Sequence, residues 1–142
     1  MAVRAAKAEW RGNLPKGNGT VETETGAVKG TYSFASRFEE GAGTNPEELI
    51  AAAHAGCFSM AFANILAKAG FEAESIRTEA KVHLSKGPAG FGISKIDLLC
   101  VGEVPGVDDA TFQKHAQEAK VGCPVSKALA ATPIHLDATL KG

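Results

Sequence analysis

The sequence predicts an α+β fold, because the segments that look like strands are clustered and do not alternate one by one with helical segments. Two further observations support this class: long stretches alternate between apolar and polar residues, and two other stretches repeat apolar residues with helical spacing. The length of 142 residues fits one domain, residues 1–142, which is large enough to bury a hydrophobic core.

The first forty residues have the pattern of strands separated by turns. Residues 20–28 alternate, with Val21, Thr23 and Thr25 on one side of the expected strand. Glycines mark the turns around them, at positions 17, 19, 26 and 30. Strand-like residues continue to Phe34, so we expect this whole region to form a sheet.

The first helix is predicted to begin at Asn45, which can cap it, with Pro46 in the first helical position and Glu48 three residues after the cap. It is expected to end near Gly70. Residues 49–67 are almost entirely apolar and long enough to cross a bilayer. They are rich in Ala and Gly, however, and strands of soluble type flank them, so we expect a buried central helix and no membrane partner.

Two strands are expected next. Residues 75–84 alternate cleanly, and the segment from Lys86 to Gly90 has the composition of a turn. Residues 91–104 return as the partner strand, with a change of phase near Ser94 that indicates a β-bulge.

The last third of the chain predicts two helices and a strand. Asp108 can cap a helix that starts near Asp109, and one of its faces carries apolar or small residues at Phe112, Ala116, Ala119 and Cys123. Proline cannot continue a helix undisturbed, so we expect one helix to end at 122–123 and another to begin at Pro124. Residues 134–140 predict a final strand.

Composition excludes several classes of protein. The net charge is −1 and no run of Lys or Arg is present, so a nucleic-acid partner is not expected. Residues 1–10 carry charges and lack the apolar core of a signal peptide, which predicts a cytoplasmic protein. Three cysteines are too few for a disulfide scaffold, and disulfides that form in a reducing compartment are usually transient and catalytic.

The cysteines allow two interpretations. Cys57 lies in the middle of the first helix, where a thiol either packs as a small apolar group or reacts with help from a second thiol and a positive charge. Cys123 precedes Pro124 at the start of a helix, where free N–H groups lower a thiol pKa. Helix electrostatics alone would make Cys123 the nucleophile and do not settle the order. Cys100 is expected to pack in the core.

Three other side chains are candidates for the site. Arg37 follows a predicted strand and is either a surface charge or the cation of a site. Glu47 is in the first helical turn, about 15 Å from Cys57 along a straight helix, so it would reach the thiol only through a bridging arginine. His54 shares a side of the helix with Cys57 and is a base, a ligand or a structural histidine.

Four segments carry a resemblance to a known family. They are residues 37–39, 43–50, 52–61 and 119–126. Together they resemble the OsmC branch of the OsmC/Ohr family, over nearly the whole chain and without departure at the key positions. The resemblance implies antiparallel sheets packed around a central buried helix, and an intertwined homodimer with two active sites at the subunit interface.

The resemblance also implies an activity. Proteins of this family are thiol-dependent peroxidases of the oxidative and osmotic stress response, which prefer organic hydroperoxides to hydrogen peroxide and use no metal, flavin or haem. By position, Cys57 corresponds to the attacking cysteine, Cys123 to the resolving one, and Arg37 and Glu47 to the catalytic arginine and glutamate. A dihydrolipoyl protein or a small thiol would reduce the disulfide. An apolar mouth is expected from Phe38, Phe58 and Met60.

Three other classes of function remain open. A metal site would use Cys57, Cys123, His54 and His115, although no zinc-type spacing is present. A cysteine hydrolase would use Cys57 and a histidine without needing Cys123. A non-enzymatic module, such as a peroxide-sensing binder, would use the cysteines for packing, although the sequence has no DNA-binding signature.

Overall fold

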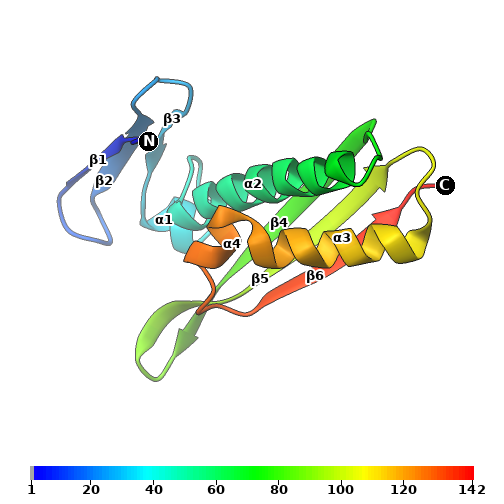
Figure 1. Cartoon of the computed structure of the whole chain (residues 1–142). Coiled ribbons are helices and arrows are strands. Elements are labelled where there is room, and N and C mark those ends of the chain that lie inside the picture. Colours follow the sequence, from blue (N-terminus) through cyan, green and yellow to red (C-terminus); the bar gives the residue numbers. More distant parts are fainter. Residues whose placement is uncertain (1) are drawn as a thin grey trace. The chain divides into compact units, whose positions relative to one another are not determined.

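The computed structural model describes residues 2–142, which form two compact units, Met1–Leu49 and Ile50–Gly142 (Figure 1). The first unit is a three-stranded antiparallel sheet followed by a short helix. Its strands are β1 (Ala6–Arg11), β2 (Asn18–Thr23) and β3 (Lys29–Tyr32), in the order β1-β2-β3, and its helix is α1 (Phe34–Phe38). The strands confirm the strand-like pattern of this region.

Helix α1 was not expected, since the sequence pattern extends the strands to Phe34. A capping box starts the helix: the Ser33 hydroxyl accepts from the backbone N–H of Ser36 at 3.1 Å, and the Ser36 hydroxyl accepts from the N–H of Ser33 at 2.8 Å. These two local hydrogen bonds stop the strand and place Arg37 in the last helical turn, not after a strand.

The expected strand of residues 20–28 is also shorter than predicted. Strand β2 ends at Thr23, whose backbone N–H donates to the carbonyl oxygen of Val28 at 2.8 Å and closes a turn. Gly26 has a φ of +76°, a conformation that residues with a side chain rarely adopt. This glycine allows the chain to reverse, so Thr25 lies in the turn.

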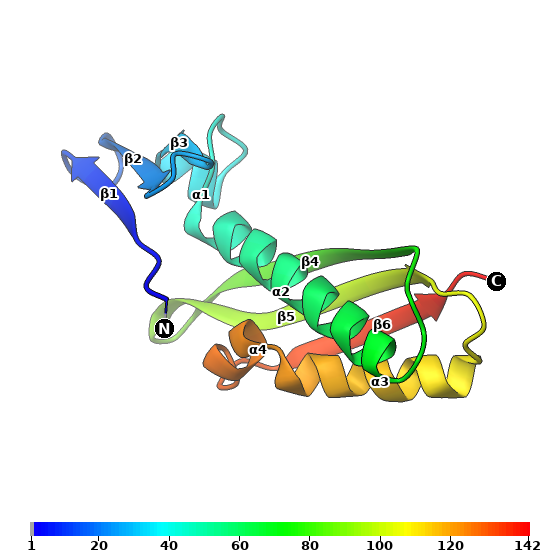
Figure 2. The same cartoon turned by 45° about the horizontal axis from the view of Figure 1, so that its top comes forward.

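The second unit is a sheet with helices on one face (Figures 1 and 2). Its elements are α2 (Pro46–Lys68, which begins at the end of the first unit), β4 (Ser75–Gly87), β5 (Gly90–Glu103), α3 (Asp109–Gly122), α4 (Pro124–Ala128) and β6 (Ile134–Leu140). All of these agree closely with the predicted segments. Asn45 caps α2 as expected, since its side-chain oxygen accepts from the N–H of Glu48 at 2.7 Å.

The sheet of the second unit has the order β4-β5-β6. Strands β4 and β5 are antiparallel, and their register shifts after His83, with Ser94 as the extra residue that the sequence predicted. Strands β5 and β6 are parallel, which corrects the expectation of purely antiparallel sheets. The reason is the connection: α3 and α4 carry the chain back to the end of the sheet where β5 began, so β6 runs in the same direction.

Helix α2 packs on this sheet through a single stripe. His54, Phe58, Phe62 and Leu66 recur every four residues and are all 0% exposed. The opposite side is open, and Met60 is 77% exposed there. Within one chain the helix is therefore buried on one face only. Phe58 also packs in the core, so it does not line a mouth as the sequence analysis proposed.

Helix α2 is long and apolar enough to span a membrane, with a mean hydropathy of 1.6 over 18 residues. The core helix of a soluble protein meets the same criterion. The continuous buried stripe of α2, packed against β5 and α3, is the feature that favours a core helix here.

The core joins α2, β5 and α3. The Phe62 ring lies 5.0 Å from that of Phe112, and the face of α3 that carries Phe112, Ala116 and Ala119 is completely buried, as predicted. Gly102 of β5 lies directly below Phe112, where a Cβ atom would come within 2.5 Å of the ring. The sheet and the helix therefore approach each other more closely than any larger residue would permit.

We expect Gly102→Ala to lower the free energy of unfolding by about 1–3 kcal/mol, because the new methyl group must displace a ring that is buried on every side. Urea denaturation followed by circular dichroism measures the change. Gly122→Ala is the matched control, since nothing lies within 4 Å of its added Cβ and its stability should stay equal or rise slightly. Equal stability of the Gly102→Ala variant and the wild type would contradict the packing described here.

Candidate active site

The structure brings the two predicted cysteines together in the second unit. Cys57 lies in the middle of α2 and is half-buried, whereas Cys123 lies between α3 and α4 and is 0% exposed. Both are free thiols, and Cys123 lies close enough to form a hydrogen bond with the Cys57 thiol. The chain therefore contains two neighbouring thiols, one of which is accessible.

The position of Cys123 follows from the proline after it. The backbone N–H of Cys123 donates to the carbonyl oxygen of Ala119 at 3.0 Å and completes α3, and Pro124 then begins α4. The Cys123 sulfur accepts from the backbone N–H of Ser126 at 3.3 Å, so it caps α4 as the sequence predicted.

The first turn of α4 also provides a hydrogen-bond donor for Cys57. The backbone N–H of Val125 hydrogen-bonds the Cys57 sulfur and lowers its pKa, just as the next N–H, that of Ser126, bonds the sulfur of Cys123. The helix-end argument that favoured Cys123 as the nucleophile therefore applies to both sulfurs. The two sulfurs differ in accessibility, because Cys57 is half-buried and Cys123 is fully buried. This difference favours Cys57 as the nucleophile.

The surroundings of Cys57 within its unit do not produce a thiolate by themselves. Burial raises the pKa of Cys57 most strongly, the Val125 N–H lowers it, and the neighbouring Cys123 raises it again. The net direction is upward. Efficient reaction at neutral pH therefore requires a further positive group.

A buried polar chain continues from Cys123. The Cys123 thiol donates to the Ser126 hydroxyl at 3.2 Å, and the Ser126 hydroxyl lies 2.7 Å from Nε2 of His54. His54 Nδ1 has no hydrogen-bond partner among residues 2–142. Burial lowers the pKa of His54, so its imidazole is neutral at physiological pH.

The two charged candidates form an ion pair in the first unit. Arg37 Nε donates to Glu47 Oε1 at 3.0 Å and its second guanidinium N–H group donates to Oε2 at 2.9 Å, so the pair is bidentate. The side chain of Glu47 is only 9% exposed, whereas that of Arg37 is 36% exposed. The hydrogen bond to Glu47 raises the pKa of Arg37, which keeps the guanidinium charged.

Local contacts fix this ion pair. Asn45 donates from its side-chain nitrogen to the carbonyl oxygen of Ser36 at 3.0 Å while it caps α2. The guanidinium carbon of Arg37 also lies 5.2 Å from the centre of the Phe38 ring. The short helix α1, which the sequence did not predict, is thus the element that holds Arg37 against Glu47.

The remaining candidates have other environments. Cys100 follows Ile96 and Leu98 on β5 and is 1% exposed, which confirms its place in the core. His115 lies 3.2 Å from Glu118 on α3. Within residues 2–142, no group of three or more histidine, cysteine or acidic side chains is arranged to hold a metal ion.

Sequence reasoning missed Ser126 and the backbone of Val125. Ser126 is the third residue after the cap of α4, a position from which a side chain often turns back toward the cap. That spacing was visible in the sequence. The contact of Ser126 with His54, which lies 72 residues earlier, was not.

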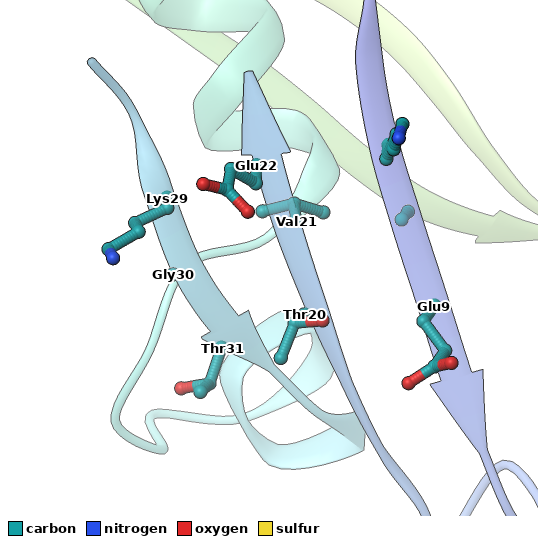
Figure 3. A pocket seen from close by; sticks show the side chains of 9 residues that line it. Glu9, Thr20, Val21, Glu22, Lys29, Gly30 and Thr31 are labelled. Atoms are coloured by element: carbon teal, nitrogen blue, oxygen red, sulfur yellow. The ribbon is translucent and has the colours of Figure 1, made fainter. Parts of the chain in front are cut away.

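A hollow of about 680 Å³ lies on the sheet of the first unit, as Figure 3 shows. Charged and hydroxyl side chains of β1, β2 and β3 line it, among them Glu9, Glu22, Lys29 and Thr31. It contains none of the four predicted site residues. The thiol pair and the ion pair therefore remain the candidates for chemistry.

Comparison with known proteins identifies the family of the chain. Residues 39–138 match the family model of OsmC-like protein. The chain is 51% identical over 139 residues to peroxiredoxin OsmC of Escherichia coli, which covers 97% of this chain and 96% of that protein. It is 36% identical over 101 residues to an organic hydroperoxide resistance protein of Xanthomonas axonopodis, covering 70% of this chain and 67% of that protein.

A solved structure from the same family has a similar fold. The crystal structure of the organic hydroperoxide resistance protein OhrB of Bacillus subtilis aligns with a TM-score of 0.72 and 26% identity, over 96% of this chain and 98% of that one. The resemblance found in the sequence is confirmed, and the chain belongs to the OsmC-like protein family.

Proposed function

We propose that this protein is a thiol-dependent peroxidase that reduces organic hydroperoxides to alcohols and reduces hydrogen peroxide less well. The observation that carries the proposal is that the accessible Cys57 thiol has the buried Cys123 thiol as its neighbour. The names of the relatives, a peroxiredoxin and an organic hydroperoxide resistance protein, support the same activity. The family resemblance further suggests a role in the oxidative and osmotic stress response.

In the first step, the Cys57 thiolate attacks the terminal oxygen of the hydroperoxide. The O–O bond breaks, the alkoxide takes a proton and leaves as an alcohol, and Cys57 becomes a sulfenic acid. Its partial exposure supports the assignment of Cys57 to this step, because a peroxide must reach the attacking sulfur. Cys123 is fully buried and is assigned to the second step.

In the second step, the Cys123 sulfur attacks the Cys57 sulfenic acid, forming a disulfide and releasing water. The Cys123 side chain is near enough to Cys57 to raise its pKa, which supports a step without a large rearrangement of the helices. A dithiol then reduces the disulfide by thiol–disulfide exchange. A dihydrolipoyl protein or a small thiol would serve as this reductant.

Arg37 is the cation proposed to activate Cys57. A free thiol with a pKa of about 8.5 is only about 3% ionised at neutral pH, and lowering the pKa to about 6 requires about 3.4 kcal/mol. A close guanidinium supplies stabilisation of this kind, and it can also stabilise the departing alkoxide. Glu47 would hold the guanidinium in the required orientation through the bidentate pair.

A second copy of the chain is proposed as the partner that covers α2. The open face of this helix carries small or apolar residues, namely Ala52, Ala53, Gly56 and Met60. In addition, no apolar side chain among residues 2–49 is buried. A three-stranded sheet needs another surface to bury its apolar groups, and a homodimer would supply such a surface for both elements.

The cysteine assignment predicts distinct products after one equivalent of cumene hydroperoxide. Wild-type protein should give a Cys57–Cys123 disulfide, Cys123→Ser should give a sulfenic acid at Cys57 that dimedone traps, and Cys57→Ser should give neither. Mass spectrometry of the peptides identifies each product, with Cys100→Ala as the control that behaves as wild type. A sulfenic acid at Cys123 would reverse the roles, and no oxidation at either thiol would remove the peroxidase proposal.

Replacing Arg37 with Met should raise the pKa of Cys57 and slow its alkylation by iodoacetamide at neutral pH, about tenfold for each unit of pKa. Peroxide turnover should fall in parallel. Arg11→Met is the matched control, because Arg11 forms an exposed pair with Glu9 at 2.7 Å in the same unit. Alkylation of Cys57 at the wild-type rate in the Arg37→Met protein would argue against the role of this cation.

The homodimer predicts that Met60→Glu converts the protein to a monomer, because the new carboxylate would be buried without a partner in the interface. Light scattering coupled to size exclusion measures the mass. Val121→Glu on α3 is the control, since Val121 is 70% exposed and Met60 is 77% exposed. A monomeric wild type, or a Met60→Glu protein that is still dimeric, would contradict this interface.

A further inference from the structure

His54 is a buried titratable group for which the two-cysteine mechanism has no use. It is 0% exposed, its Nδ1 atom has no hydrogen-bond partner within residues 2–142, and its single polar contact there is the Ser126 hydroxyl. Burying an imidazole with one nitrogen unsatisfied is unfavourable, and an apolar side chain of similar size would pack without this cost. A buried group of this kind calls for a specific explanation.

The contacts of His54 lead directly to a reacting atom. The sulfur of Cys123 lies 3.2 Å from the Ser126 hydroxyl, which lies 2.7 Å from His54 Nε2. A serine hydroxyl has one proton to donate and lone pairs to accept with. Ser126 can therefore accept the thiol proton of Cys123 while it donates its own proton to the imidazole. All three side chains are shielded from water, since Ser126 is 3% exposed and the other two are 0% exposed.

We propose that Ser126 and His54 form a relay that takes the proton of the Cys123 thiol when Cys123 attacks the Cys57 sulfenic acid. This inference rests on the proposed peroxidase function and concerns only its second step. Ser126 touches the reacting sulfur, whereas His54 is a positioning residue that acts through Ser126. The Cys123 thiol is fully buried, so water cannot reach it to act as a base. In the relay, His54 is the base that takes up the proton.

The step is balanced as follows. The Cys123 sulfur forms a bond with the Cys57 sulfur while the S–O bond of the sulfenic acid breaks, so Cys123 is oxidised and Cys57 is reduced to the level of the disulfide. The thiol proton passes to Ser126, whose own proton passes to His54 Nε2. His54 then gives this proton back through Ser126 to the departing hydroxide, which leaves as water. No other oxidant or reductant is needed.

The protonation state of His54 suits this task. Burial alone lowers its pKa, and no charged side chain contributes to the shift. The titratable groups around it are Cys57 on its own helix and Cys123 at the start of α4; Lys120 and Lys127 line a hollow next to Ser126. The imidazole is therefore neutral at physiological pH and free to accept a proton, which the thiol releases more readily as the S–S bond forms.

A single-turnover experiment on the full chain separates the two chemical steps. Reduced protein is mixed with one equivalent of cumene hydroperoxide, and quenched samples are analysed for sulfenic acid at Cys57 and for the disulfide. Ser126→Ala breaks the relay at its centre, and His54→Gln keeps a hydrogen-bonding group but cannot take up a proton. Ser59→Ala is the matched control, since Ser59 is a hydroxyl residue of α2 that bonds Thr78 at 2.7 Å.

Sulfenic acid formation should be within about threefold of wild type in all variants. Disulfide formation should slow by at least about tenfold in Ser126→Ala and His54→Gln, because a positioned base contributes about 10²- to 10⁴-fold. Ser126→Thr, which retains the hydroxyl, should recover most of the rate, and Ser59→Ala should match wild type.

The pH profile distinguishes a proton relay from a merely structural contact. In wild type, disulfide formation should lose rate as His54 is protonated, with an inflection below the ordinary histidine value of 6.5. In His54→Gln this inflection should disappear. Disulfide formation at the wild-type rate in both variants, or an unchanged inflection in His54→Gln, would overturn the relay alone. Absence of both the sulfenic acid and the disulfide at Cys57 in wild type would overturn the peroxidase and the relay with it.

Discussion

The interruption between α3 and α4 at Pro124 is the constraint on which the thiol site depends. Proline has no N–H to donate and cannot extend α3, so Cys123 adopts an extended conformation, with ψ of 136°, and a new helix begins. The first free N–H groups of that helix, those of Val125 and Ser126, then bond the two sulfurs. One backbone interruption thus places the second cysteine and supplies donors for both.

Two opposing effects act on Cys57. Burial and the neighbouring thiol raise its pKa, and the single N–H of Val125 does not reverse that direction. Burial keeps water away from the reaction between the two sulfurs. The same burial disfavours the charged Cys57 thiolate, which is needed for the first step. A permanently charged guanidinium can resolve this conflict, and the Arg37–Glu47 pair holds one that cannot lose its proton at physiological pH.

Much of the local structure could be predicted, because its causes are local. Asn45 and Asp108 cap their helices, and the phase change at Ser94 is a bulge, all within a few residues of the signals that indicated them. Helix α1 was missed although its cause is also local, since the Ser33 and Ser36 capping box lies in a stretch that otherwise reads as strand. In that case two side-chain hydrogen bonds outweigh the strand propensity around them.

The sequence by itself determined the helices and strands that follow Asn45, the Cys123–Pro124 junction and the family, because each depends on neighbouring residues or on motifs. Only the tertiary structure decided that β6 runs parallel to β5 and that His54 meets Ser126, 72 residues later. It also decided which thiol is accessible. These features depend on how α2, α3 and the sheet pack around Phe62, Phe112 and Gly102, and such long-range packing leaves no periodic signal in the chain.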